Sequence, residues 1–97
     1  MIGAVLGAVM GGSIGRSMDE ADLYCTGQTL EHVPDRQPIK WRNPDDNRSY
    51  VVTPTKSYLH AGGYCREYTT KSTIKGTTRQ VTNTACRQND GAWRIES

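Results

Sequence analysis

Residues 63–88, "GYCREYTTKSTIKGTTRQVTNTACRQ", decide the fold of this chain because they indicate two long strands joined by a tight turn. The candidate strands cover residues 64–74 and 77–87 and are rich in Thr and Tyr, which favour β-structure. Lys75-Gly76 has the length of a two-residue hairpin loop, in which Gly supplies the positive φ that such loops need. The stretch therefore predicts an antiparallel hairpin.

A turn at these two residues also fixes which residues face each other. Ile74 faces Thr77, and the same register places Cys65 opposite Cys86 in a pair without backbone hydrogen bonds. The Cα atoms of such a pair lie about 4.5 Å apart, which a disulfide accepts. We therefore predict a Cys65–Cys86 disulfide that closes a loop of about twenty-two residues and adds about 3 kcal/mol of stability.

The hairpin register sorts the side chains onto two faces. The face with more apolar residues is expected to form the core, against a helix and the two Trp residues. It carries Tyr64, Tyr68, Ile74, Val81 and Ala85, together with Arg66, Thr70, Ser72, Arg79 and Arg87. The more polar face carries both cysteines with Glu67, Thr69, Lys71, Thr82 and Thr84.

Strand and turn signals continue on both sides of the hairpin. Residues 50–58 predict a strand in which Pro54 marks a bulge or an edge. Residues 92–96 predict a last short strand, and residues 43–46 have the composition of a type I turn. Upstream, Ser17 and Glu20 have the spacing of a capping box, which predicts a helix over residues 18–31 and then a polar linker.

Gly3, Gly7, Gly11 and Gly15 recur every fourth residue in an apolar, uncharged segment. On a helix they would form a smooth groove that lets another helix approach closely, as membrane helices do. We therefore expect a glycine-zipper helix that packs in a membrane; the alternative is a flexible Gly-rich leader. The segment is shorter than the roughly twenty residues that span a bilayer.

The composition limits the classes of function. Ninety-seven residues form one small domain with a thin core, and the net charge of +2 comes from basic residues that stand singly, which argues against a nucleic-acid partner. We divide the chain into a membrane-associated segment (1–16), a capped helix with linker (17–39) and an antiparallel β domain (40–97).

Few residues suggest chemistry. The cysteines have no C-x-x-C spacing, and His32 and His60 have no ligand at close spacing, so we expect no redox centre, metal site, cofactor, catalytic residue or small-molecule substrate. A Cys65–His60 nucleophile remains a minor alternative to the disulfide. Cys25 is either a small buried hydrophobe or the site of an intermolecular disulfide.

The chain resembles the 17 kDa surface antigen family, glycine-zipper outer-membrane lipoproteins of Gram-negative bacteria. The resemblance rests on the glycine ladder followed by "GSIGRSMDEAD", "WRNP", "YVVTP", "YCREY", "TACR" and "DGAWRI", in that order. It implies an exported protein at the outer membrane with a periplasmic or surface-exposed β domain, in a compartment where disulfides persist. The chain shows neither a signal peptide nor a lipobox Cys, so we expect its natural start to lie upstream.

Together these observations predict an α+β fold: a glycine-zipper helix, a short connector helix and a meander of four to five antiparallel strands braced by one disulfide. The predicted function is that of a non-enzymatic envelope antigen that associates with outer-membrane lipid and self-associates through the zipper. The alternative is a periplasmic or surface module that binds an envelope ligand or inhibits a hydrolase. Its expected binding surface consists of Tyr64, Arg66, Tyr68 and Arg87.

Overall fold

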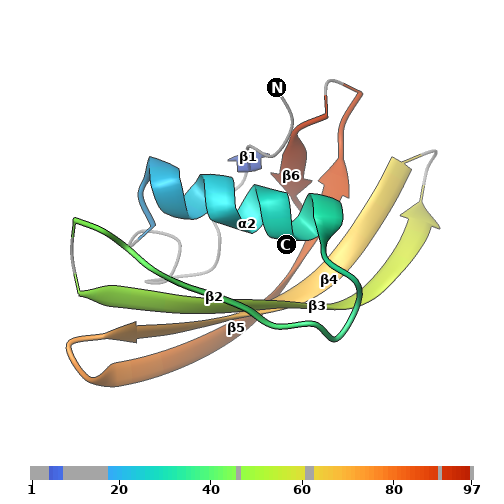
Figure 1. Ribbon diagram of the computed structural model, residues 1–97. Coiled ribbons are helices and arrows are strands. Elements are labelled where there is room, and N and C mark those ends of the chain that lie inside the picture. The colour runs from blue at the N-terminus through green and yellow to red at the C-terminus, as the bar shows by residue number, and fades with distance from the viewer. Residues whose placement is uncertain (1–4, 8–17, 46, 61–62, 90, 97) are drawn as a thin grey trace.

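The structure is a computed structural model of the 97-residue chain that describes residues 5–7, 18–45, 47–60, 63–89 and 91–96. It contains one six-stranded sheet in the order β1-β6-β5-β4-β3-β2, with α2 lying across one face (Figure 1). Strands β2 to β6 are antiparallel neighbours in chain order, and β1 runs parallel to β6. The elements are β1 (Val5–Gly7), α2 (Glu20–His32), β2 (Ile39–Arg42), β3 (Arg48–His60), β4 (Gly63–Ile74), β5 (Thr77–Arg87) and β6 (Trp93–Ile95).

The predicted fold class is wrong in its N-terminal part. Val5–Gly7, inside the expected glycine-zipper helix, forms β1 and pairs with β6 in the register Val5–Trp93 and Gly7–Ile95. The strand supplies hydrogen-bonding partners to an edge of β6 that would otherwise be open, and this long-range pairing outweighs the helical spacing of the glycines. Gly3, Gly11 and Gly15 lie outside the described residues. No described helix is long and apolar enough to cross a membrane.

The hairpin agrees with its sequence. Lys75 and Gly76 have φ values of 51° and 81°, which a two-residue loop of this hand requires. The register then runs unbroken from Ile74–Thr77 to Cys65–Cys86. The predicted disulfide is confirmed, with 4.0 Å between the two Cα atoms. A short turn thus sets the position of a covalent bond at the far end of the hairpin.

Strand β3 contains the irregularity that Pro54 predicts. Its register with β4 shifts between Pro54 and Lys56, so Thr55 is the extra residue of a bulge. Strand β2 pairs with β3 only over Ser49–Val52, and the Arg36 N–H donates to the Pro54 carbonyl just beyond that. The bulge therefore lies at the point where β3 stops pairing with β2 and instead hydrogen-bonds to the loop that contains Arg36.

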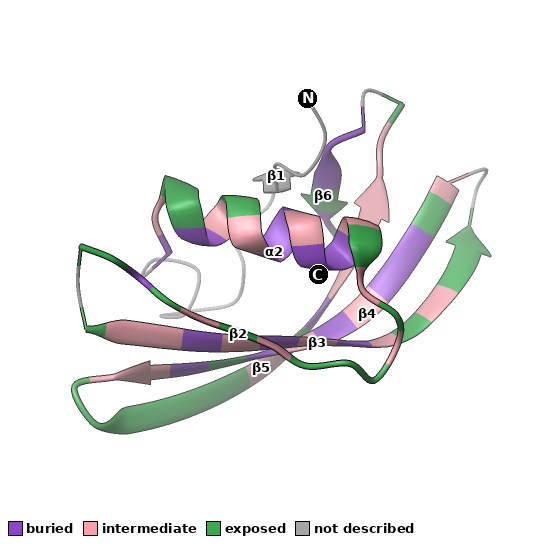
Figure 2. Cartoon of the chain, in the orientation of Figure 1, coloured by how far each residue is buried: buried purple, intermediate pink, exposed green. Residues whose placement is uncertain are grey.

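The core lies between α2 and the sheet face that the hairpin register predicted. In Figure 2 the buried residues of α2 are on its side toward the sheet. Leu30 of α2 is completely buried, as are Tyr68 of β4 and Ala85 of β5. The core cluster consists of Met18, Leu30, Tyr50, Val52, Tyr68, Ala85, Trp93 and Ile95.

The helix begins two residues later than expected, and its cap differs from the predicted one. Asp19 is the N-cap: its side chain accepts from the Asp22 N–H at 3.1 Å, and the Asp22 carboxylate accepts from the Asp19 N–H at 3.1 Å. Ser17, the predicted cap, lies outside the described residues. Two aspartates three residues apart form the same reciprocal pair as the Ser/Glu box.

Candidate functional site

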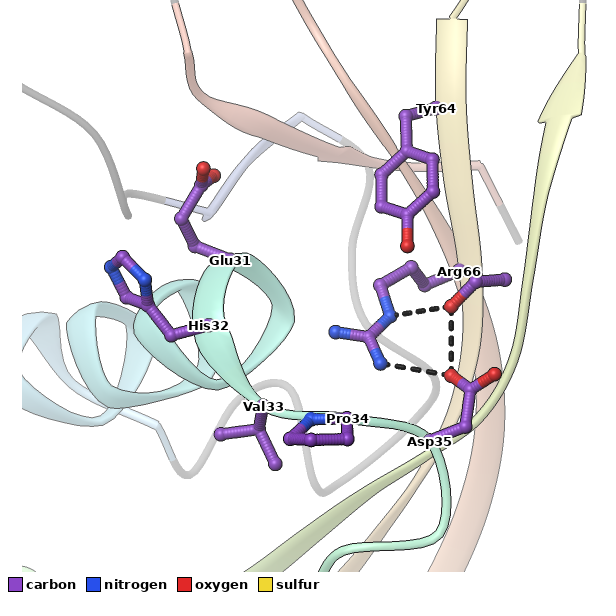
Figure 3. A pocket seen from close by; sticks show the side chains of 8 residues that line it. Glu31, His32, Val33, Pro34, Asp35, Tyr64 and Arg66 are labelled. Atoms are coloured by element: carbon purple, nitrogen blue, oxygen red, sulfur yellow. Dashed lines mark hydrogen bonds and ion pairs between the residues drawn. The ribbon is translucent and has the colours of Figure 1, made fainter.

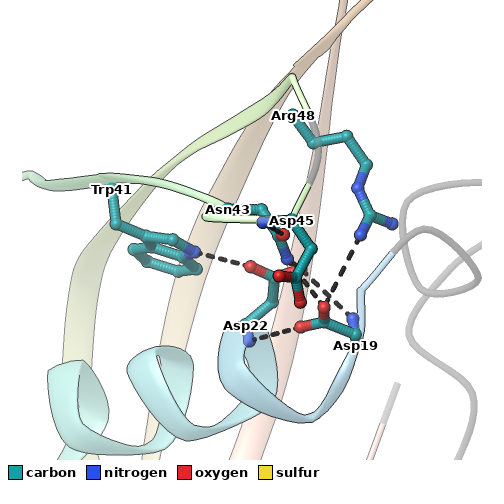
Figure 4. Close-up of polar contacts among 6 residues, drawn as sticks. All are labelled: Asp19, Asp22, Trp41, Asn43, Asp45 and Arg48. Carbon is teal, nitrogen blue, oxygen red and sulfur yellow. Dashed lines mark hydrogen bonds and ion pairs between the residues drawn. The ribbon is translucent and has the colours of Figure 1, made fainter.

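A polar cluster joins the first turn of α2 to the β2–β3 connection (Figure 4). Trp41 Nε1 donates to Asp22 Oδ1 at 2.9 Å, and Asn43 Nδ2 donates to Asp22 Oδ2 at 3.0 Å and to Asp19 Oδ2 at 2.8 Å. Asp22 and Asn43 are almost completely buried. The hydrogen bond from Asn43 lowers the pKa of Asp19, and Arg48 at 3.7 Å adds to the effect. The helix N-terminus is thus fixed by donors from the sheet.

A second cluster holds the other end of α2. Arg66 of β4 is 4% exposed and donates three hydrogen bonds: from Nε to Ser57 Oγ at 2.9 Å, from Nη1 to the Leu30 carbonyl at 2.7 Å and from Nη2 to Asp35 Oδ1 at 2.8 Å. The hydrogen bond from Arg66 lowers the pKa of Asp35. A cation at a helix C-terminus also satisfies carbonyl groups that lack partners within the helix.

Glu31 makes the third connection between α2 and the sheet. Its Oε1 atom accepts from Arg87 Nε at 2.9 Å and from Trp93 Nε1 at 3.1 Å. Burial raises the pKa of Glu31, but the hydrogen bonds from Arg87 and Trp93 outweigh it, so the net shift is downward. One carboxylate therefore ties α2 to both β5 and β6.

A cleft of about 300 Å³ opens beside the second cluster (Figure 3). Tyr64, which is 42% exposed, lines it together with Arg66, Asp35 and Ser57. The ion pair between Arg66 and Asp35 lies within this lining, where Ser57 Oγ also donates to Asp35 Oδ1 at 2.7 Å. The cleft can offer hydrogen-bonding groups to a small polar segment, but its charges already neutralise each other.

A second cleft of about 400 Å³ runs along the other side of α2 and is mainly apolar. Tyr24, Cys25 and Trp41 are among its lining residues. Cys25 is a free, partly buried thiol, and burial raises its pKa, so the thiol stays protonated at neutral pH. A protonated thiol is a weak nucleophile.

The structure places the four residues of the predicted binding surface in different environments. Tyr64 and Arg66 meet at the polar cleft, but Arg66 is buried there by its own partners. Tyr68 is completely buried in the core, which raises the pKa of its phenol. Arg87 is partly buried against Glu31. They do not form one accessible surface, because the core face of the hairpin lies under α2.

The sequence motifs instead supply side chains that hydrogen-bond α2 to the sheet. "WRNP" contributes Trp41 and Asn43, "CREY" contributes Arg66, and "ACR" with "DGAW" contributes Arg87 and Trp93. Sequence reasoning missed their partners Asp22, Glu31 and Asp35. The sequence did offer a signal for these partners. Arginines occupy positions 66 and 87 on the face expected to form the core, and a buried guanidinium requires a nearby carboxylate or carbonyl.

Within the described residues no group of three or more His, Cys, Asp or Glu side chains is placed to hold a metal ion. Gly7 lies in strand β1, and Gly3, Gly11 and Gly15 lie outside the described residues. The structure therefore does not test the predicted role of these glycines in helix packing. The predicted self-association stays a prediction.

Comparison with known proteins identifies the family. A family model described as 17 kDa outer membrane surface antigen matches residues 28–94. The chain is 43% identical over 87 residues to the 17 kDa surface antigen of Rickettsia bellii, covering 84% of this chain and 55% of that protein. It is 50% identical over 82 residues to the 17 kDa surface antigen of Rickettsia prowazekii, covering 79% and 52%.

The 17 kDa surface antigen of Rickettsia felis is 44% identical over 83 residues, 80% of this chain and 52% of that protein. The chain thus spans about half the length of the curated relatives it matches. No solved structure matches it significantly. The extent of the family match and the identity to the rickettsial proteins show that the chain belongs to the 17 kDa surface antigen family.

Proposed function

We propose that this chain is part of a non-enzymatic surface antigen of the bacterial envelope, held at the outer membrane in a structural role. The observation that carries the proposal is the match of residues 28–94 to a family described as an outer membrane surface antigen. Because the chain spans about half of its relatives, the proposal concerns the whole natural protein.

Two structural features support this role. The Cys65–Cys86 disulfide suits an oxidising compartment such as the periplasm or the cell surface. The charged side chains beside the polar cleft are engaged with one another: Arg66 binds Asp35, and Arg87 binds Glu31. Such pairs fix α2 on the sheet, so the domain keeps one arrangement of helix and strands and exposes one surface.

Cell fractionation of the full-length natural protein tests the proposal. Expressed from its own start in a Gram-negative host, the protein should sediment with outer-membrane markers and should react on intact cells with antibodies raised against residues 18–97. A periplasmic marker that antibodies reach only after permeabilisation is the control. Recovery in the cytoplasm, or with three free thiols per chain, would overturn the proposal.

A binding module is the second candidate, and the polar cleft favours it. Tyr64 contributes a half-exposed ring at the mouth of a cleft that offers hydrogen-bonding groups. Replacing Tyr64 by Ser should then abolish capture of an envelope component by the immobilised protein. Tyr24→Ser is the matched control, because Tyr24 is similarly exposed but lines the other cleft. Equal capture by both variants would count against the cleft.

A further inference from the structure

Strand β2 forms one edge of the sheet, and two of its residues turn their backbone groups outward. The Asn43 N–H donates to the Arg48 carbonyl at 2.9 Å, so these residues form a hydrogen-bonded pair that continues the β2–β3 register. Because hydrogen-bonded and non-hydrogen-bonded pairs alternate, Arg42 and Lys40 belong to non-hydrogen-bonded pairs, and their N–H and C=O groups point away from β3. No described residue forms a backbone hydrogen bond with them from the open side.

The two faces of β2 differ in character. The Trp41 side chain is directed toward α2, where its Nε1 donates to Asp22 Oδ1 at 2.9 Å (Figure 4). Side chains alternate along a strand, so Ile39 shares the helix side with Trp41. Lys40 and Arg42 lie on the opposite face, which we call the outer face, and both are exposed. A strand laid beside β2 would thus meet apolar residues on the helix side and cations on the outer face.

The apolar cleft of about 400 Å³ beside α2 runs along this edge. Three successive residues of β2 line it, Ile39, Lys40 and Trp41, and α2 contributes Tyr24 and Cys25. Tyr24 is 51% exposed. No carboxylate of the described residues lines the cleft. The cleft therefore offers the apolar side chains of a neighbouring strand a place between β2 and α2.

The cations of β2 lie beside uncharged residues of β3 on the outer face. Arg42 donates to Asn47 Oδ1 at 2.7 Å, whereas Lys40 forms no ion pair with a described residue. Asp45 follows in the turn after β2 and is nearer in sequence to Arg42 than to Lys40. Lys40 is therefore the cation whose charge an added strand would meet uncompensated.

We propose that the edge of β2 binds an extended acidic and apolar segment of a partner protein, which adds to the sheet as an antiparallel strand. Residues directly opposite each other in a ladder project to the same face. The partner residues opposite Lys40 and Arg42 are therefore acidic, and those between them are apolar and enter the apolar cleft. Addition of a peptide to a sheet edge is a recurrent mode of recognition. The proposal goes beyond the envelope role proposed above and does not depend on it.

A second copy of the chain fits this edge poorly. If two β2 strands paired, Lys40 and Arg42 would lie opposite cations of the other copy, and like charges directly opposite each other are destabilising. Lysine on an edge strand is one of the features that prevent such self-pairing. A small apolar ligand could enter the cleft but would leave the outward backbone groups without partners. The backbone groups and the charge of Lys40 together favour an acidic strand.

Nuclear magnetic resonance of the 97-residue chain with a synthetic hexapeptide that alternates glutamate and valine tests the assignment. At physiological ionic strength the peptide should move the amide proton resonances of Lys40 and Arg42 downfield, because both N–H groups gain acceptors. A hexapeptide that alternates lysine and valine should bind about fivefold more weakly. No binding of the glutamate peptide, or shifts confined to other residues, would overturn the proposal. So would dimers of the chain alone that shift the same two resonances, because the occupant would then be a second copy.

Reversing the charge of Lys40 tests the outer-face contact. Lys40→Glu should weaken binding of the glutamate peptide about fivefold and strengthen binding of the lysine peptide to a similar extent. Lys71→Glu is the matched control, because Lys71 is exposed in the same row of the outer face, two strands further from the edge. It lies roughly 14 Å from the added strand, beyond the screening length of about 8 Å, so both affinities should change less than about twofold. Equal effects of the two variants would mean attraction by net charge alone and would overturn the assignment to this edge.

Methylation of the peptide nitrogens tests the strand pairing itself. In an antiparallel ladder the N–H groups of the glutamates opposite Lys40 and Arg42 donate to the carbonyls of these two residues, and the valine N–H groups point to solvent. N-methylation of the glutamates should therefore abolish binding, and N-methylation of the valines should change it less than about twofold. An equal loss from both modifications would overturn strand addition.

Cys25 reports which peptide side chains enter the cleft. A peptide in which a central valine is replaced by cysteine, activated as a thiopyridyl disulfide, should form a mixed disulfide with Cys25 at mildly alkaline pH. The Cys25 thiolate attacks the peptide sulfur, and thiopyridone leaves. The same cysteine at a glutamate position should react at the slow rate of the activated reagent without a peptide. Faster reaction from the glutamate position would overturn the assignment of faces.

Tyr64→Ser keeps this site apart from the polar cleft. Tyr64 lines only the polar cleft, so its replacement should leave binding of the glutamate peptide unchanged. Loss of peptide binding in Tyr64→Ser, with retention in Lys40→Glu, would assign the peptide to the polar cleft and overturn the proposal.

Discussion

At the scale of single residues, the charged side chains that stand out in the sequence motifs, Arg66 and Arg87, have structural roles. Arg66 is nearly inaccessible, yet it satisfies a helix carbonyl, a hydroxyl and a carboxylate at once. A buried guanidinium of this kind is stable only when all three partners are present, because an unpaired buried charge is costly. Arg66 therefore fixes the position of the helix end and of the residues that follow it.

Replacing Arg66 by Ala should lower the free energy of unfolding by about 2 kcal/mol. The change removes packing and three hydrogen bonds, although Asp35 is partly exposed and can be hydrated afterwards, which reduces the cost. Urea unfolding at neutral pH measures the effect. Arg79→Ala, at an exposed site on the same face of the hairpin, should stay within about 0.5 kcal/mol of the parent.

The carboxylates of these clusters should make stability depend on pH. Asp19, Glu31 and Asp35 have pKa values lowered in the folded state, so each binds its proton more weakly than in the unfolded chain. Their contribution is complete above the ordinary pKa values of 3.8 and 4.5 and is lost as the pH falls through the lower folded values.

The urea midpoint should therefore drop between about pH 5 and pH 2. In Asp35→Asn the drop should be shallower, because one of the linked protons is gone. An Asp35→Asn profile that runs parallel to the parent would show that this pair contributes nothing to the acid sensitivity.

At the scale of elements, the two-residue turn and the helix cap differ in how well the sequence predicts them. Lys75-Gly76 sets the register of β4 and β5 by local geometry alone, so the disulfide partner could be found by counting residues. The helix start could not be found that way. Asp19 is the cap partly because Asn43, distant in sequence, donates to its carboxylate, and a local motif search does not include such a contact.

Removing the Asp19 carboxylate should weaken α2 at its first turn. Asp19→Ala should lower the melting temperature, because the Asp22 N–H loses its acceptor and Asn43 loses a partner. Thermal unfolding followed by circular dichroism measures the loss. Glu20→Ala removes an exposed carboxylate from the same turn and is the control; equal costs for both would point to the helix dipole rather than the cap.

Reduction of the Cys65–Cys86 bond should lower the free energy of unfolding by about 3 kcal/mol, because the open chain gains the entropy of the loop that the bond closes. Guanidinium unfolding with and without reductant measures this difference. Cys25→Ala should respond to reductant as the parent does, since Cys25 is a free thiol. A reduced form as stable as the oxidised one would contradict the role of the bond as a brace.

At the scale of the whole molecule, two features could not be predicted from the sequence. The sheet face turned away from α2 carries Lys40, Arg42, Lys56, Lys71 and Arg94, which stand singly in the chain and are brought together only by the strand pairing from β2 to β6. The strand conformation of Val5–Gly7 depends on its pairing with β6, near the other end of the chain. The spacing of residues within a segment shows which local structures that segment can form. Pairing with a strand distant in sequence decides which of these structures it adopts.

Deleting residues 1–7 tests the role of β1 in the whole sheet. The shortened chain should unfold at lower urea concentration and associate more readily, because the edge of β6 loses its partner and becomes open to other chains. Size-exclusion chromatography and urea unfolding give the two readouts. Deleting residues 1–4 alone keeps β1 and should change neither; identical behaviour of both deletions would show that the β1–β6 pair contributes nothing.

The β1–β6 pair also has a consequence for the order of folding. It joins residue 5 to residue 93, so the sheet reaches its final width only when nearly the entire chain is free to move. Contacts between such distant residues form late, because the entropy of closing the loop must be overcome first. The hairpin of β4 and β5 needs only a local turn and can form early. If the chain crosses a membrane unfolded, the β4–β5 hairpin at the centre of the sheet would therefore form first. The β1–β6 pair at its edge would form only after β6 has emerged.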